Sequence, residues 1–228
     1  MTHPVGDERD AASQGTGLST RRALAVLKSL LSTPRRRIRK YRELGPYGRL
    51  LVWGTLTRPY WRRRFHHFGP KTLLYRPAWV YRPHQMSIGD EVIIMQSAWL
   101  EIGEPAWSTR DPVLRIGNRV SIRSHCTISA AEAVVIEDDV LIAGFVSIYD
   151  SDHTISGLWN PMWNQQKTAP VRIGRGTWVG ERVTILRGAD IGEQCIIGAG
   201  SVVKGRIPGH SIAVGAPARV VGSTRAAS

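Results

Sequence analysis

Cysteine is scarce in this chain of 228 residues, which has only two, Cys126 and Cys195. Two cysteines cannot build the disulfide framework of a small secreted protein, and they lack the close spacing of a zinc motif. Long apolar runs are also missing, since no stretch approaches the ~20 residues that cross a bilayer. The first twenty residues lack the apolar core of a signal peptide and are expected to form a disordered tail. We therefore expect reduced thiols, a cytoplasmic location and no metal.

Acidic residues are scarce in the first 70 positions, where fifteen Arg or Lys stand against four Asp or Glu. Of the net charge of +13, therefore, +11 lies in this segment, and the rest of the chain is nearly neutral. Basic residues mixed with aromatic ones occur on helices that bind anionic membranes and on surfaces that bind nucleic acid. Residues 21–75 are expected to form a basic, partly helical arm.

The arm has two interpretations that the residues leave open. Residues 21–70 could hold the protein at an anionic membrane surface, which would make it peripheral at the inner face of the membrane. Four apolar residues would then lie at the headgroup boundary, namely Leu50, Leu51, Trp53 and Trp61. Alternatively, the arm packs against a neighbouring subunit. Nucleic acid is not expected as a partner.

An aliphatic residue recurs at every sixth position over much of the remaining chain. The fifteen positions are Ile88, Ile94, Leu100, Ile116, Ile122, Ile128, Ile136, Ile142, Ile148, Ile173, Val179, Ile185, Ile191, Ile197 and Val203. A period of six fits neither the 3.6-residue period of a helix nor simple alternation. It is typical of a parallel β-helix, in which the aliphatic residue points into a narrow core and successive coils stack at strand spacing. About five coils of three repeats are expected over residues 76–208.

The fifth position of each repeat is usually small or β-branched, which suits a corner where the chain turns. Cys126 and Cys195 both occupy this position, so we expect buried, structural cysteines. The pattern stops after Ile148 and resumes at Ile173. This break contains His153 and an excursion loop, residues 154–172. Residues 209–228 are expected to form a C-terminal capping segment and tail.

Three further motifs follow the break: "TWVG", "IGAGSVV" and "VGAPARVV". Together with the repeats, they resemble the left-handed β-helix acyltransferases of hexapeptide repeats. The resemblance covers about residues 76–222 and is strongest to the maltose, galactoside and Nod-factor O-acetyltransferases and to the acetyltransferases of exopolysaccharide synthesis. It implies an acetyl-CoA-dependent enzyme with a left-handed coil, a homotrimer, and active sites between adjacent subunits.

The resemblance identifies His153 with the catalytic histidine of the family, which acts as general base on the acceptor hydroxyl. Imidazole suits this role because its pKa lies near neutrality. Asp150 and Asp152 either orient the imidazole or simply form a turn, and the turn is the simpler interpretation. His125 is expected to be structural. Three converging histidines, as in a zinc enzyme of this fold, are not available inside the coils.

The same resemblance assigns a coenzyme A site. Trp178 would line the pantetheine groove, and the backbone amides around Gly180 and Glu181 would stabilise the oxyanion. Ala199, Ser201 and Lys204 would flank the cofactor, with Arg206 and Arg219 as alternative phosphate partners.

The excursion loop offers side chains for a sugar or polysaccharide precursor. Trp159 and Trp163 could stack on sugar rings, and Asn164 could bind hydroxyls, although both Trp side chains could equally pack on a neighbouring subunit. A non-catalytic trimeric β-helix scaffold, recruited to membranes by its basic arm, is the alternative function. Binding of acetyl-CoA distinguishes the two, because a scaffold has no reason to bind it.

Overall fold

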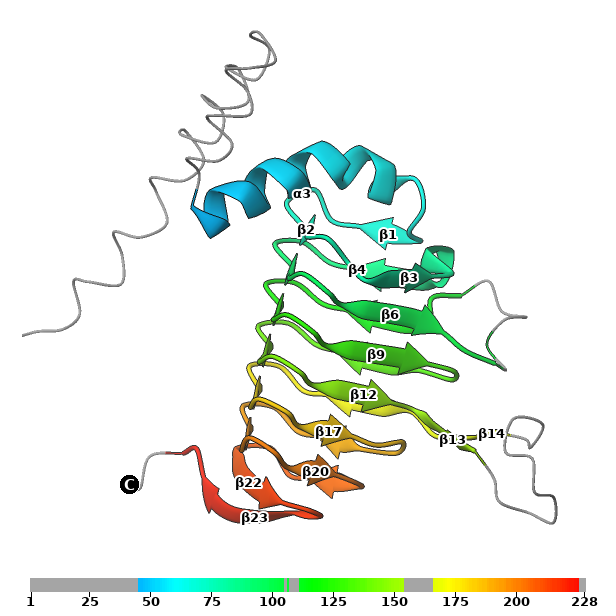
Figure 1. Ribbon diagram of the computed structural model, residues 1–228. Helices are drawn as coiled ribbons and strands as arrows, with labels where there is room; N and C mark the ends of the chain where they lie inside the picture. Colours follow the sequence, from blue (N-terminus) through cyan, green and yellow to red (C-terminus); the bar gives the residue numbers. More distant parts are fainter. Residues whose placement is uncertain (1–44, 105, 107–110, 154–165, 226–228) are drawn as a thin grey trace, which may run out of the picture. The chain divides into compact units, whose positions relative to one another are not determined.

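The computed structural model describes residues 45–104, 106, 111–153 and 166–225. The excursion side chains Trp159, Trp163 and Asn164 and residues 21–44 of the basic arm therefore lie outside the described residues. Contacts divide the chain into two compact units, residues 1–56 and 57–228. The second unit contains the whole coil stack (Figure 1).

Among the described residues, the α-helix that precedes the stack is α3 (Pro46–Arg62), and it begins with Pro46, whose fixed φ suits the first helical turn. Two of the four apolar residues expected to contact a membrane have little exposed surface with which to do so. Leu50 is 3% exposed, and Trp61 is partly buried against the hydrophobic core of the second unit. Trp53 remains 38% exposed. None of the described helices is long and apolar enough to cross a membrane.

Three parallel sheets form the sides of the coil stack. Sheet A contains β1 (His67–Phe68), β4 (Met86–Ile88), β7 (Leu114–Ile116), β10 (Val134–Ile136), β15 (Val171–Ile173), β18 (Asp190–Ile191) and β21 (Arg206–Ile207). Sheet B contains β2 (Leu73–Leu74), β5 (Ile93–Ile94), β8 (Ser121–Ile122), β11 (Leu141–Ile142), β16 (Trp178–Val179), β19 (Ile196–Ile197), β22 (Ser211–Gly215) and the antiparallel β23 (Ala218–Ser223). Sheet C contains β3 (Trp79–Tyr81), β6 (Trp99–Ile102), β9 (Thr127–Ala130), β12 (Ser147–Tyr149), β17 (Thr184–Ile185) and β20 (Val202–Val203).

The chain visits the sheets in the order A, B, C in every coil, which explains the six-residue period. Each sheet receives one aliphatic residue per coil, and register aligns these residues in columns, as in Ile122, Ile142 and Val179 of sheet B. All three are fully buried. Burying one such side chain contributes about 1.5–3 kcal/mol, so the stack is stabilised by many equal contributions.

The stack is longer than the sequence predicts. Six complete coils and the start of a seventh replace the expected five, and the first coil begins at β1 inside the segment expected to be arm. Phe68, Leu74 and Val80 already follow the six-residue period. A short 3₁₀ helix, η2 (Pro83–Gln85), then lengthens the next interval, so the repeat is hard to recognise in the sequence. At the other end, β22 continues sheet B beside β19, and β23 pairs with β22 in the antiparallel direction.

Candidate active site

His153 lies at the end of a short antiparallel pair that leaves the stack after β12. The pair consists of β13 (Ser151–His153) and β14 (Gln166–Thr168), with His153 opposite Gln166. In Figure 1, β13 continues the direction of β12 away from the coils. The imidazole is exposed. The break in the repeat therefore places a titratable group outside the stack.

Asp150 lies where the β13–β14 pair leaves the coil stack. Its side chain is fully buried, and its carboxylate accepts hydrogen bonds from the backbone N–H groups of Ala131 (2.7 Å), Glu132 (2.8 Å) and Ala133 (2.8 Å). Burial raises the pKa of the Asp150 carboxyl, and the three N–H donors oppose that shift. Asp150 thus holds the turn of the preceding coil, in agreement with the structural interpretation.

Asp152 holds the pair to the following coil. Its carboxylate forms an ion pair with the Nε of Arg187, which lies in the turn after β17. Successive side chains of a strand point to opposite faces, so this contact directs His153 to the other face of β13. Asp152 therefore fixes the strand that carries the imidazole and does not orient the ring itself. Sequence reasoning missed Arg187, because its partner lies 35 positions away.

Five of the six residues expected to bind coenzyme A lie around the corner between sheets B and C, whereas Lys204 follows β20 at the other edge of sheet C. Trp178 is 50% exposed on β16, and Ala199 is exposed one coil further on. A Cβ at Gly180 would lie 2.6 Å from the backbone N of Ala199, so only glycine allows the two backbones to approach this closely.

The structure refines three further expectations about the coenzyme A site. The Gly180 N–H already donates to the Ile197 carbonyl at 2.8 Å, whereas no described residue accepts from the Glu181 N–H. Ser201 is 1% exposed, and its hydroxyl accepts from the Gly215 N–H, so its side chain is directed inward. Lys204 is exposed in the turn between β20 of sheet C and β21 of sheet A, away from the B–C corner. Glu181 is therefore the better placed of the two candidate amide donors.

His153 and the Glu181 amide lie at opposite edges of sheet C. Glu181 precedes β17 at the B–C corner, where the Arg182 N–H donates to the Gly144 carbonyl. His153 lies beyond the other end of the adjacent β12, six residues past Ser147, which is opposite Thr184. Six extended residues span about 20 Å. One chain therefore does not bring the candidate base and the candidate amide donor together.

Aromatic and basic side chains also line the B–C corner. The rings of His125 and Phe145 stack with centroids 4.8 Å apart and an interplanar angle of 8°, and the guanidinium of Arg182 lies 5.2 Å from the Phe145 ring centre. His125 is exposed and does not belong to the core. Its contacts are nonetheless structural, because it packs along the corner.

Both cysteines are buried at corners, as the repeat predicts, each 1% exposed. Burial raises the pKa of the Cys126 thiol to about 11, which makes a catalytic thiolate unfavourable. Among the described residues, no group of three or more His, Cys, Asp or Glu is arranged to hold a metal ion.

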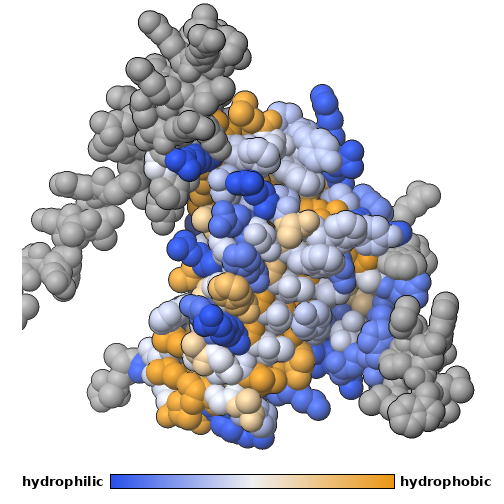
Figure 2. All heavy atoms as spheres, in the orientation of Figure 1, coloured by the Kyte–Doolittle hydropathy of each residue, from blue (hydrophilic) through white to orange (hydrophobic). Residues whose placement is uncertain are grey.

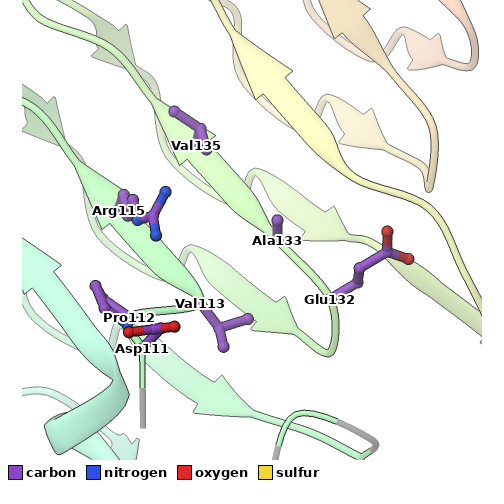
Figure 3. A pocket seen from close by; sticks show the side chains of 7 residues that line it. All are labelled: Asp111, Pro112, Val113, Arg115, Glu132, Ala133 and Val135. Atoms are coloured by element: carbon purple, nitrogen blue, oxygen red, sulfur yellow. The ribbon is translucent and has the colours of Figure 1, made fainter. Parts of the chain in front are cut away.

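Glu132 and Ala133, in the turn that Asp150 holds, help to line a small pocket (Figure 3). Its lining consists of Asp111, Pro112, Val113, Arg115, Glu132, Ala133 and Val135. Its volume is about 140 Å³. Ligand pockets usually enclose roughly 300–1,000 Å³, so we assign no ligand to this one.

Sequence comparisons relate the chain to known acetyltransferases. A family model described as bacterial transferase hexapeptide (six repeats) matches residues 170–205. The Mycobacterium tuberculosis protein named "Probable acetyltransferase Rv3034c" is 40% identical over 125 residues, which are 54% of this chain and 42% of that protein. The galactoside O-acetyltransferase of Escherichia coli is 30% identical over 158 residues, which are 66% of this chain and 75% of that enzyme. The matched region spans 42–60% of the length of the first three relatives.

Solved structures share the fold. A variant of AntD, an N-acyltransferase from Bacillus cereus, in complex with dTDP and coenzyme A, matches with a TM-score of 0.63 at 24% identity, over 73% of this chain and 88% of that chain. This likeness concerns the fold alone. Since the galactoside O-acetyltransferase is matched over 75% of its length and the repeat model coincides with β15 to β20, the chain belongs to the hexapeptide-repeat acyltransferases, which fold as a left-handed parallel β-helix.

Proposed function

We propose that this protein transfers the acetyl group of acetyl-CoA to a hydroxyl of a sugar or polysaccharide precursor, with His153 as general base. The observation that carries the proposal is the exposed imidazole on β13, held outside the stack by Asp150 and by the Asp152–Arg187 ion pair. A buried or unanchored histidine would not suit a substrate-facing base.

In the proposed reaction, the His153 imidazole takes the proton of the acceptor hydroxyl while the hydroxyl oxygen attacks the thioester carbonyl. The Glu181 N–H stabilises the oxyanion that develops on the carbonyl oxygen. When the tetrahedral intermediate collapses, the C–S bond breaks and the leaving thiolate takes the proton from the imidazolium. Trp178 and Ala199 would border the pantetheine arm.

The proposed site needs two copies of the chain, because His153 and Glu181 lie at opposite edges of sheet C. We propose a homotrimer in which the B–C corner of one copy faces the β13–β14 pair of the next. In a cyclic assembly with head-to-tail contacts, every B–C corner faces the β13–β14 pair of a neighbouring copy, so every site is complete. The galactoside acceptor named for the Escherichia coli relative supports a saccharide as substrate.

Release of free thiol from acetyl-CoA tests the reaction, measured with simple sugars, a lipid-linked oligosaccharide and chloramphenicol as acceptors. We expect turnover with at least one saccharide. A trimeric protein that neither binds nor consumes acetyl-CoA would instead establish the scaffold function.

Mixing two inactive variants tests the shared site. Ala199→Trp fills the exposed cofactor edge, and His153→Ala removes the base. If His153 and the cofactor edge of one site come from different copies, random co-assembly of the two variants gives about a quarter of the interfaces both an intact His153 and an intact Ala199. If each site lies within one chain, the mixture stays as inactive as its components.

A further inference from the structure

The two corners that flank sheet B differ in how their charges are balanced. On the corner between sheets A and B, carboxylates and cations pair across coils, as in the ion pair of Arg119 with Asp139 at 2.6 Å. Among the described residues of the B–C corner, Glu181 is the one carboxylate, and it already pairs with Arg182 at 2.7 Å. Arg123 lies on the same corner and forms no ion pair with any described residue. The B–C corner therefore carries an excess of positive charge.

Arg123 is exposed at the N-terminal end of a column of small residues. The residue that follows each strand of sheet B donates its backbone N–H to the next coil, and this places Arg123, Ala143, Gly180 and Gly198 in one column. Successive coils are about 4.8 Å apart, so Arg123 and Gly180 are separated by two coils, or about 10 Å. This separation leaves room for an acceptor between the Arg123 guanidinium and a thioester held at the Glu181 amide.

A row of stacked side chains borders this column on the side of sheet C. The rings of His125 and Phe145 are 4.8 Å apart and nearly parallel, and the Arg182 guanidinium lies 5.2 Å from the Phe145 ring centre. Hydrophilic and hydrophobic spheres accordingly lie side by side along the left edge of the stack in Figure 2, where sheet B meets sheet C. Because the row is already packed, a ligand that binds against it loses little additional conformational entropy.

The phosphates of coenzyme A do not account for Arg123. In the proposed site, the pantetheine arm runs from the Glu181 amide past Ala199, toward the C-terminal coils, and the phosphates follow beyond the arm. Arg123 lies on the opposite, N-terminal side of the reacting carbonyl. The acceptor must approach from that side, because the arm fills the other one.

The chemistry of Arg123 identifies the class of acceptor. From its position, and resting on the proposed function, we infer that the acceptor is an acidic saccharide whose carboxylate or phosphate pairs with the Arg123 guanidinium. The planar fork of an arginine matches both groups in bidentate geometry. An acidic acceptor gains this charge-assisted contact, and a neutral sugar of the same shape does not.

Acceptors that differ only in the acidic group test the inference. Thiol release from acetyl-CoA is measured with the methyl glycosides of glucose, galactose and mannose, with their uronic acid forms, and with the forms phosphorylated at the primary hydroxyl. We expect at least one acidic form to exceed its neutral partner in kcat/KM by about tenfold or more, and the preference should decrease as salt is added. Preference for the uronic acid identifies a carboxylate as the recognised group, and preference for the phosphorylated form identifies a phosphate.

A matched pair of arginine variants assigns the preference to one side chain. Arg123→Gln should lower kcat/KM for the acidic acceptor by about 10–100-fold more than for its neutral partner, with the KM for acetyl-CoA unchanged. Arg115→Gln removes another exposed arginine, on sheet A, that forms no ion pair with a described residue, and it should not change the preference. Both variants should unfold at the temperature of the parent protein, because both side chains are exposed.

The outcomes separate this inference from the proposed reaction. Turnover of neutral acceptors with no acidic preference, or a preference that Arg123→Gln leaves intact, overturns the inference and leaves the reaction standing. A raised KM for acetyl-CoA in Arg123→Gln assigns the cation to the cofactor and also overturns the inference. Thiol release with no acceptor of either kind overturns the proposed reaction, and this inference with it.

Discussion

Asp150 and His153 are three residues apart, yet one is buried within the coil stack and the other is exposed outside it. Asp150 closes a coil, is fully buried and satisfies three backbone amides. His153 lies outside the coils and is exposed, and the strand that carries it is held by the Asp152–Arg187 ion pair. The comparison shows that the residues at the corner of the stack stabilise the fold, while the candidate base lies just outside the stack. Changes in the two regions should therefore affect different measurements.

The largest effect on activity is expected from His153→Ala. Loss of a general base should lower kcat by roughly 10²–10⁴-fold, with the unfolding temperature unchanged because the imidazole is exposed. Steady-state thiol release and thermal unfolding measure the two quantities. His84→Ala, at another exposed histidine, is the control and should keep normal turnover. Near-normal turnover of His153→Ala would refute its role.

The largest effect on stability is expected from Asp150→Ala. Three backbone N–H groups lose their acceptor, which should cost about 3 kcal/mol in the free energy of unfolding. For a chain of this size, that corresponds to a decrease of about 6–12 °C in Tm. Asp150→Asn keeps one acceptor oxygen and should lose less. Asp139→Ala removes an exposed carboxylate and should have little effect, so an equal loss in all three variants would contradict this assignment.

A smaller effect, confined to activity, is expected from Arg187→Gln. An ion pair this exposed contributes only about 0–1 kcal/mol to stability. Displacing β13 should nonetheless lower kcat about tenfold, because a misplaced base reacts poorly. The KM for acetyl-CoA should not change, since Arg187 does not lie at the B–C corner. Arg187→Lys should restore part of kcat, and a changed KM with normal kcat would argue against a positioning role.

The smallest effect is expected from the basic arm. Because Leu50 is buried and Trp61 is partly buried, attraction to a membrane would rest mainly on charge, at about 1 kcal/mol per Arg or Lys near an anionic surface. Co-sedimentation with anionic vesicles should therefore decrease steeply with salt and be lost on deletion of residues 1–44. Neutral vesicles should not bind either protein. Equal binding to both lipids would exclude this electrostatic mechanism.

The sequence by itself determined the β-helix, the buried corner cysteines and the family, because each repeat makes contacts only with its immediate neighbours. Local spacing is then enough to specify the coil. It misplaced the first coil, because the 3₁₀ helix Pro83–Gln85 lengthens the interval between Val80 and Ile88. It also selected His153 as a candidate base.

Only the tertiary structure decided what each polar residue of the break contacts. The partners of Asp150 lie 17 to 19 positions away, and Arg187 lies 35 positions from Asp152. No local pattern encodes such pairings, because they depend on how insertions shift one coil against the next. The same holds for the distance between His153 and Glu181, which lie at opposite edges of sheet C. Stacking of coils, and not spacing along the chain, determines which edge each side chain occupies.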